Sequence, residues 1–214
     1  GINALELCLR VGREGYLILT TPYSNVVLVP SAQARGEERS KDQLELEQES
    51  FYRRWLPQIA NDPAYNRNLN LNGDSFGLYP GSRTGWNPLC TRNVPAVLGL
   101  ALNSSAIGHY RVSQPLFELQ NAGRIVGRVA YDMPSIIEVE RQSPDVVIFQ
   151  GRYNPNKIND IVQLKNYSQA MRIYELDDFV VRIPEKNEHT RNMPDNIEAM
   201  MRKGIAMCDR VVVS

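Results

Sequence analysis

Short apolar runs alternate with helix-compatible stretches from about residue 94 to the end of the chain. The apolar runs, each about the length of one buried strand, cover 95–102, 124–131, 145–149, 171–176 and the segment from 210. The helix-compatible stretches between them cover 112–120, 134–141, 156–170 and 195–208. Strands that alternate with helices form parallel βαβ units, so an α/β fold with a Rossmann-like parallel sheet is predicted. Right-handed crossovers favour the strand order 3-2-1-4-5.

This strand order predicts where a ligand would bind. Parallel sheets place ligands beyond the carboxyl ends of their strands, at the point where the strand order reverses. In the order 3-2-1-4-5 the first and fourth strands are neighbours. We therefore expect the loops at 103–110 and 177–190 to face each other across that switch point. Binding or modification of a small molecule there is the predicted class of activity.

The first 80 residues carry a different pattern. A helix is predicted over 3–14, followed by strands at 16–20 and 25–29 and by a long helix over 42–60. Carboxylates crowd the amino-terminal half of the long helix, which suits the helix dipole. The following stretch, 61–92, is rich in Asn, Gly and Pro. The sequence thus predicts a small α+β extension over 1–80, a linker over 81–93 and the main domain over 94–214.

Composition excludes several functional classes. The 24 basic and 24 acidic residues cancel, so the excess positive charge of a nucleic-acid-binding protein is lacking and no nucleic-acid partner is expected. The three cysteines are widely spaced, which indicates reduced thiols in a cytoplasmic protein and predicts neither a disulfide framework nor a zinc site. No apolar run approaches the length of a membrane span.

The loop after the first predicted strand offers groups for an anionic or hydroxylated ligand. Ser104 and Ser105 precede a predicted helix start, where backbone N–H groups favour anions, and Tyr110 and Arg111 follow them. The alternative is an ordinary βα loop with serine capping and a solvated arginine. Gly108 stands alone where a dinucleotide site needs Gly-x-Gly-x-x-Gly, so NAD binding is not expected.

Candidates for proton transfer and hydroxyl binding lie at the same predicted edge. Histidine is the most frequent general base in enzymes, so His109 is the first candidate base, and a surface or structural histidine is the alternative. Asp177 and Asp178 end the fourth predicted strand, where adjacent side chains point to opposite faces. Asp177 is therefore the second candidate base, and Asp178 a substrate-binding candidate. The segment 150–153 follows the third strand and is predicted to line the edge of the cleft, with Gln150 as the substrate-binding candidate. No metal site is predicted.

The predicted sheet brings these candidates together. We expect His109 or Arg111 to come within a side chain's reach of Asp177 or Asp178, directly or through water. A carboxylate so placed would hold an imidazolium or anchor Arg111 as a clamp.

Several segments of the main domain form a recognisable set. Tyr174–Asp178 reads YELDD, Asn196–Arg202 reads NIEAMMR and Cys208–Ser214 reads CDRVVVS. With 108–112 and Pro115-Leu116 they resemble the amino-terminal, acceptor-side half of a GT-B glycosyltransferase of the family 4 type. In that family a "YE-x-DD" strand end precedes a helix and an "aD-x-V-x-V-S" strand. Its first loop carries a Tyr/Arg pair near the acceptor pocket, which the resemblance places at Tyr110 and Arg111.

The first 80 residues resemble a different family, the carboxyl-terminal tail of a family 2, GT-A glycosyltransferase. The matching segments are Leu5–Arg10, Gly15-Tyr16, Thr21–Tyr23, Ser31–Gly36, Phe51–Trp55 and Asp62–Leu69. The corresponding stretch at 26–30 contains no histidine, the residue that completes the metal site in that family. The leading acidic motif is reduced to Glu6. Metal-dependent transfer by this part is therefore not expected.

The two resemblances together imply a piece of a multi-domain glycosyltransferase of surface-polysaccharide or glycan biosynthesis. Its partners would be a glycan or lipid-linked acceptor, the latter with peripheral membrane association, and the remaining domains of the parent chain. The nucleotide-sugar donor would bind in a domain after Ser214, so the fragment itself is expected to hold no cofactor and to be inactive alone. The main alternative is a non-catalytic carbohydrate-binding or scaffolding module. A nucleotide-sugar epimerase or dehydrogenase is a third reading, weakened by the single glycine of the first loop.

Overall fold

The chain forms two compact units in its computed structural model, Gly1–Ile59 and Ala60–Ser214. The structure describes residues 2–19, 21–23, 40–66, 68–71, 77–78, 93–177, 180–182 and 196–213. Among them, none of the helices combines the length and the hydropathy needed to cross a membrane. The predicted domain limits at 80 and 94 stay predictions.

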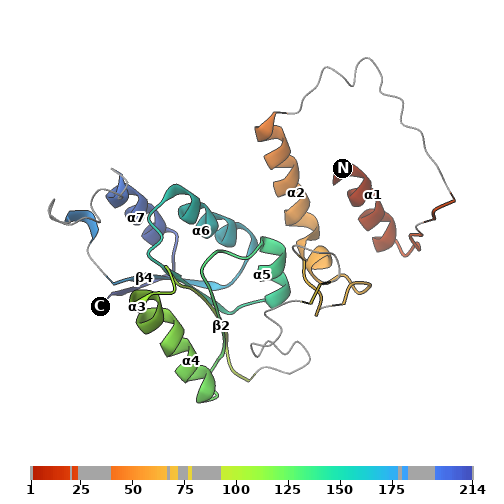
Figure 1. The fold of residues 1–214 in the computed structure, drawn as a ribbon. Coiled ribbons are helices and arrows are strands. Elements are labelled where there is room, and N and C mark those ends of the chain that lie inside the picture. Colours follow the sequence, from red (N-terminus) through yellow and green to blue (C-terminus); the bar gives the residue numbers. More distant parts are fainter. Residues whose placement is uncertain are drawn as a thin grey trace. The chain divides into compact units, whose positions relative to one another are not determined.

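The described part of the first unit is helical. Its helices are α1 (Ile2–Arg13) and α2 (Lys41–Ala60), which confirms both helix predictions and places them side by side (Figure 1). Arg54 donates to Glu6 at 2.7 Å, and the Arg13 guanidinium lies 5.2 Å from the ring centroid of Trp55. The strand predicted at 16–20 is wrong for the described residues 16–19. Their apolar side chains are exposed, and a lone strand without a neighbour is not stable; the strand predicted at 25–29 lies outside the described residues.

The second unit is built on a five-stranded, all-parallel sheet. Its strands are β1 (Ala96–Leu100), β2 (Val126–Ala130), β3 (Val146–Gln150), β4 (Met171–Leu176) and β5 (Arg210–Val213). Each neighbouring pair is parallel. The predicted Rossmann-like α/β fold is therefore confirmed.

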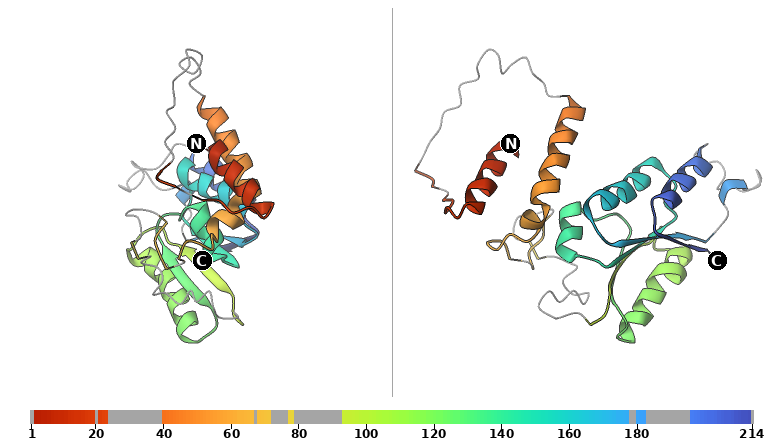
Figure 2. Two further views of the ribbon diagram at one scale, coloured as in Figure 1. Left: turned by 90° about the vertical axis from the view of Figure 1, so that its right-hand side faces the viewer. Right: turned by 180° about the vertical axis from the view of Figure 1, so that it is seen from behind.

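Helices cover both faces of this sheet. One face carries a continuous helical run of α3 (Ala106–Gly108), η3 (His109–Ser113) and α4 (Gln114–Asn121), and the other carries α5 (Ile136–Gln142), α6 (Pro155–Tyr167) and α7 (Ile197–Ala206) (Figures 1 and 2). A short 3-10 turn, η4 (Val180–Arg182), precedes α7. The helical run packs closely on β1, because a Cβ at Gly99 would lie 2.4 Å from Leu116 and 2.6 Å from Val112.

The order of the strands is 2-1-3-4-5 and not the predicted 3-2-1-4-5. Side-chain character explains the difference. β2 contains Gly127 and Arg128 and is only half buried, which suits an edge strand, whereas β3 is a continuous apolar run that suits an interior position. β1 therefore lies between β2 and β3.

Two aspartates fix this arrangement at the amino-terminal edge of the sheet. Asp145, just before β3, accepts from the Ala96 backbone N–H at 2.6 Å and donates its own N–H to the Ala96 carbonyl at 2.8 Å. Asp209, just before β5, makes the same pair of bonds to Arg172 of β4, both at 2.8 Å. Each aspartate thus ties the start of its own strand to the neighbouring strand and sets the register of the pair.

Candidate functional site

The observed strand order moves the predicted site. The connection from β1 to β2 runs toward one edge, and the remaining connections run toward the other, so the order reverses between β1 and β3. In sheets of the order 2-1-3-4-5 this is the switch point where ligands bind. The two segments that flank it are 101–105 and 151–154. The predicted adjacency of β1 and β4 is therefore wrong, since β3 lies between them, and most of the segment 177–190 lies outside the described residues.

The segment after β1 is shorter than predicted. Asn103 accepts from the backbone N–H and the hydroxyl of Ser105, at 3.0 and 2.6 Å, and the helical run begins directly afterwards at Ala106. Ser104 and Ser105 are exposed, and the Ser105 side chain does not cap the helix. His109, Tyr110 and Arg111, predicted to lie in a loop, are helical.

A π-helical turn carries those three residues. The Gln114 backbone N–H donates to the His109 carbonyl five residues earlier, and Pro115 follows. Proline has no N–H and clashes with the carbonyl four residues before it, which here belongs to Arg111. The proline accounts for the wider turn, and single π turns of this kind are frequent at functional sites.

Gly108 holds the helix start against the preceding segment. A Cβ on this residue would lie 1.9 Å from the Asn103 carbonyl oxygen, a backbone atom. Only glycine permits this approach. A close contact within the protein thus explains the glycine at this position, and a bound dinucleotide is not needed to explain it.

Arg111 reaches the end of β4 across β3. Its Nε and Nη2 atoms lie 2.7 and 2.6 Å from Oε1 of Glu175. The Glu175 side chain is 5% exposed and that of Arg111 31%. The second oxygen of Glu175, Oε2, is buried and has no hydrogen-bond partner among the described residues.

The sequence predicts that His109 or Arg111 comes within reach of Asp177 or Asp178, and the partner that the structure gives Arg111 is Glu175. In the parallel pairing of β3 with β4, Glu175 stands beside Gln150, whose amide bonds to the helical run on that face. Glu175 therefore points to the same face as the helix that carries Arg111. Asp178 lies outside the described residues.

Gln150 is fully buried, and its side-chain amide connects β3 to the segment after β1 through hydrogen bonds. Its Oε1 accepts from the Leu102 N–H at 2.9 Å, and its Nε2 donates to the Ile107 carbonyl at 3.3 Å. Both ends of the amide are thus bonded within the chain. Gln150 positions the switch-point segment, and a direct role in lining a cleft, as predicted, would require these bonds to break.

The two candidate bases lie in different surroundings. His109 is exposed, and its ring packs edge-on against exposed Tyr110 with the centroids 5.2 Å apart. Asp177 lies near the half-buried Tyr153. Burial, and after it the negative charge of Asp177, raise the pKa of the Tyr153 phenol. Both candidates remain predictions.

A buried arginine stands on the other side of the switch point, in the segment 150–153 that the sequence places at the edge of the cleft without a separate role for the arginine. Arg152 is 2% exposed, its Nη2 donates to the Tyr131 carbonyl at 3.1 Å, and its Nε is buried without a partner in the described structure. Burial lowers the pKa of Arg152, and Asp160 and Asp132 oppose that shift. A charged residue directly after a buried strand was the available signal, since Arg152 follows Gln150-Gly151.

Two described groups at this edge, Oε2 of Glu175 and Nε of Arg152, are therefore buried without a hydrogen-bond partner among the described residues. The described residues include no group of three or more His, Cys, Asp or Glu side chains placed to hold a metal ion. Comparison of the chain with protein-family models, with curated proteins and with solved structures finds no match.

Proposed function

We propose that residues 94–214 form the acceptor-side domain of a GT-B type glycosyltransferase, which binds a glycan or lipid-linked acceptor at the carboxyl edge of the sheet. The Arg111–Glu175 pair carries this proposal. It joins the helix after β1 to the end of β4 and leaves one buried carboxylate oxygen, Oε2 of Glu175, without a partner in the described part of the chain. A buried carboxylate oxygen gains most from a hydroxyl donor, and sugars offer many such donors.

Each group at this edge has a distinct role in the proposal. Glu175 accepts a hydroxyl of the acceptor, and Arg111 holds the carboxylate in place while its exposed part faces the ligand. Gln150 fixes the segment that carries Ser104 and Ser105. Either His109 or Asp177 removes the proton of the attacking hydroxyl, and both assignments stay open. The nucleotide-sugar donor binds to a separate domain of the parent chain, so this chain alone does not transfer sugar.

A non-catalytic carbohydrate-binding module is the second candidate. One observation favours it: Tyr110 is 66% exposed and stands beside His109, so the pair offers an aromatic surface of the kind on which sugar rings stack. In this case binding would depend on Tyr110 and no base would be needed.

Saturation-transfer difference NMR tests the proposal on the chain itself. The probes are glucose, galactose, mannose, lactose and cellobiose, and we expect a saturation-transfer signal, which reports binding, for at least one of them. Glu175→Gln should weaken that binding about tenfold, because it removes a charged acceptor of a buried hydrogen bond. Glu198→Gln is the matched control, since Glu198 forms an exposed pair with Arg202 on α7.

The outcomes separate the two candidates. Equal binding by wild type and Glu175→Gln, with loss in Tyr110→Ala, would favour the binding module. The absence of a saturation-transfer signal for all five sugars would contradict both candidate functions. Saturable micromolar binding of uridine-diphosphate glucose to this chain would contradict its assignment to the acceptor side.

A further inference from the structure

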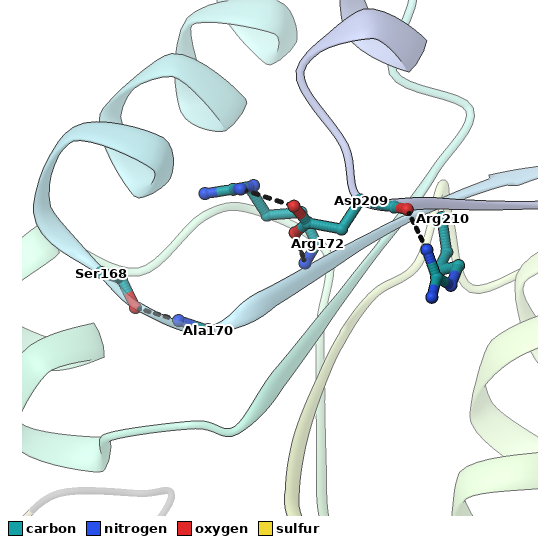
Figure 3. A network of polar contacts seen from close by, with 5 residues as sticks. All are labelled: Ser168, Ala170, Arg172, Asp209 and Arg210. Atoms are coloured by element: carbon teal, nitrogen blue, oxygen red, sulfur yellow. Dashed lines mark hydrogen bonds and ion pairs between the residues drawn. The ribbon is translucent and has the colours of Figure 1, made fainter.

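A polar hollow opens at the opposite edge of the sheet from the switch point. Its volume is about 620 Å³. The end of α6 contributes Lys165 and the following Ser168, the start of β4 contributes Met171 and Arg172, and the start of β5 contributes Arg210 with the preceding Asp209. Part of this wall is drawn in Figure 3. The proposed function makes no use of this hollow.

The carboxylates of the hollow are committed to the protein. Asp209 accepts from the Arg172 backbone N–H and from its guanidinium, one bond to each oxygen and both at 2.8 Å (Figure 3). Those bonds lower the pKa of Asp209, which keeps the pair ionised. Asp145, which also lines the hollow, accepts from the Ala96 N–H at 2.6 Å. Each aspartate therefore already accepts hydrogen bonds from the protein, which reduces its repulsion of an anionic ligand.

The cations are less fully used. Arg210 donates one bond, from Nη1 to the Asp209 carbonyl at 3.0 Å. In the part of the chain that the structure describes, the Lys165 ammonium makes no hydrogen bond or ion pair, and the buried Nε of Arg172 has no partner. The Ser168 hydroxyl oxygen accepts from the Ala170 N–H at 3.1 Å, which leaves its own proton free to donate.

The balance of charge favours an anion. Three cationic side chains, of Lys165, Arg172 and Arg210, face two carboxylates, of Asp145 and Asp209. The carboxyl end of α6 adds a partial negative charge of about half a unit, which does not cancel the excess. The volume of the hollow, about 620 Å³, lies within the range of small-molecule sites, which starts at about 300 Å³. The hollow therefore has room for more than a bare phosphate ion.

We propose that this hollow binds the phosphate group of a phosphate monoester. Lys165 and Arg210 supply the charge, Ser168 donates a hydrogen bond, and the Arg172–Asp209 pair forms the rigid floor between them. The remaining volume accommodates the group to which the phosphate is attached. That group belongs either to a soluble metabolite or to a lipid headgroup, and both share the same recognition chemistry.

Backbone amide NMR of the whole chain tests this proposal. Glycerol 3-phosphate is titrated at constant ionic strength with sodium chloride as the reference, and saturable shifts are expected at Ala170, Arg172 and Arg210. Lys165→Gln and Arg210→Gln should each weaken binding about tenfold, the effect of one lost charged contact. Arg202→Gln removes an exposed charge from α7 outside the hollow and should leave binding unchanged.

Four outcomes decide the question. Equal affinity in Arg210→Gln, Lys165→Gln and Arg202→Gln, all three with unchanged circular dichroism, would overturn the proposal, as would the absence of saturable shifts. Equal saturation by inorganic phosphate and glycerol 3-phosphate would mean that the ester group makes no contact, which overturns the monoester assignment. Sedimentation with phosphatidylcholine–phosphatidic acid vesicles, lost in Arg210→Gln, would identify the lipid as the source.

Discussion

Carboxylates at the two edges of the sheet are used in opposite ways. At the amino-terminal edge Asp145 and Asp209 accept backbone N–H bonds from neighbouring strands and so complete the main-chain hydrogen bonding. At the carboxyl edge the Glu175 carboxylate bonds to the Arg111 side chain through one oxygen, and its other oxygen is buried without a partner among the described residues. The same chemical group therefore completes main-chain hydrogen bonding at one end of the sheet and keeps an unpaired, buried oxygen at the other. The acceptor binding that we propose for the carboxyl edge rests on this difference.

The largest effect should follow removal of the arginine at the carboxyl edge. Arg111→Met leaves the buried Glu175 carboxylate without its ion-pair partner, and the free energy of unfolding should fall by about 2–3 kcal/mol. Urea denaturation followed by circular dichroism measures this change. Arg202→Met breaks an exposed helix pair and should cost less than about 0.5 kcal/mol. If both variants lose the same stability, the carboxyl-edge pair has no special role.

A somewhat smaller effect is expected at the glycine that locks the same edge. Gly108→Ala places a methyl group 1.9 Å from the Asn103 carbonyl oxygen, so the backbone has to shift. We expect a loss of about 2 kcal/mol, typical of overpacking, despite the higher helix propensity of alanine. Gly12→Ala in α1 is the control, because its Cβ would make an ordinary 3.4 Å contact and should stabilise the helix. Similar gains in both variants would show that the edge is loosely held.

The smallest effect belongs to the amino-terminal edge and depends on pH. Arg172 lowers the pKa of Asp209, so the ionised carboxylate stabilises the fold at neutral pH, and this contribution is lost as the pH falls through that lowered pKa. Asp209→Asn keeps an acceptor oxygen but removes the charge. It should lower stability by about 0.5 kcal/mol at neutral pH, because the pair is partly exposed, and by nothing in strong acid. A loss that is equal at both pH values would show that the charge does not matter.

The sequence pattern predicted the elements of the second unit better than their arrangement. The predicted strand at 171–176 has the observed bounds of β4, because apolar runs between helices mark strands directly. Strand order failed because crossover rules alone do not say which strand lies at an edge. Arg128 in β2 carried that information, since a charged residue in the middle of a strand favours an edge position.

The site was predicted in its parts but not in its pairings. The reach of Arg111 to the end of the fourth strand was predicted from an adjacency of the first and fourth strands that the structure does not have. Its partner depends on side-chain alternation, which places Glu175 on the helix side of the sheet. The burial of Gln150 and Arg152 could not be inferred, because it depends on contacts with segments distant in the sequence. The amino-edge hollow joins 165–172 with 209–210, which no local pattern connects.

The π turn at His109–Ser113 separates two parts of one helix that serve different purposes. Such a turn holds one residue more than an α-helical turn, and each residue of an α-helix rotates the chain by about 100°. Loss of a single residue there would turn Arg111 relative to α4 while Leu116 kept its contact with β1. The π turn thus lets the orientation of Arg111 change independently of the packing of α4. An insertion or deletion at this turn would re-orient the side chains before it without disturbing the core.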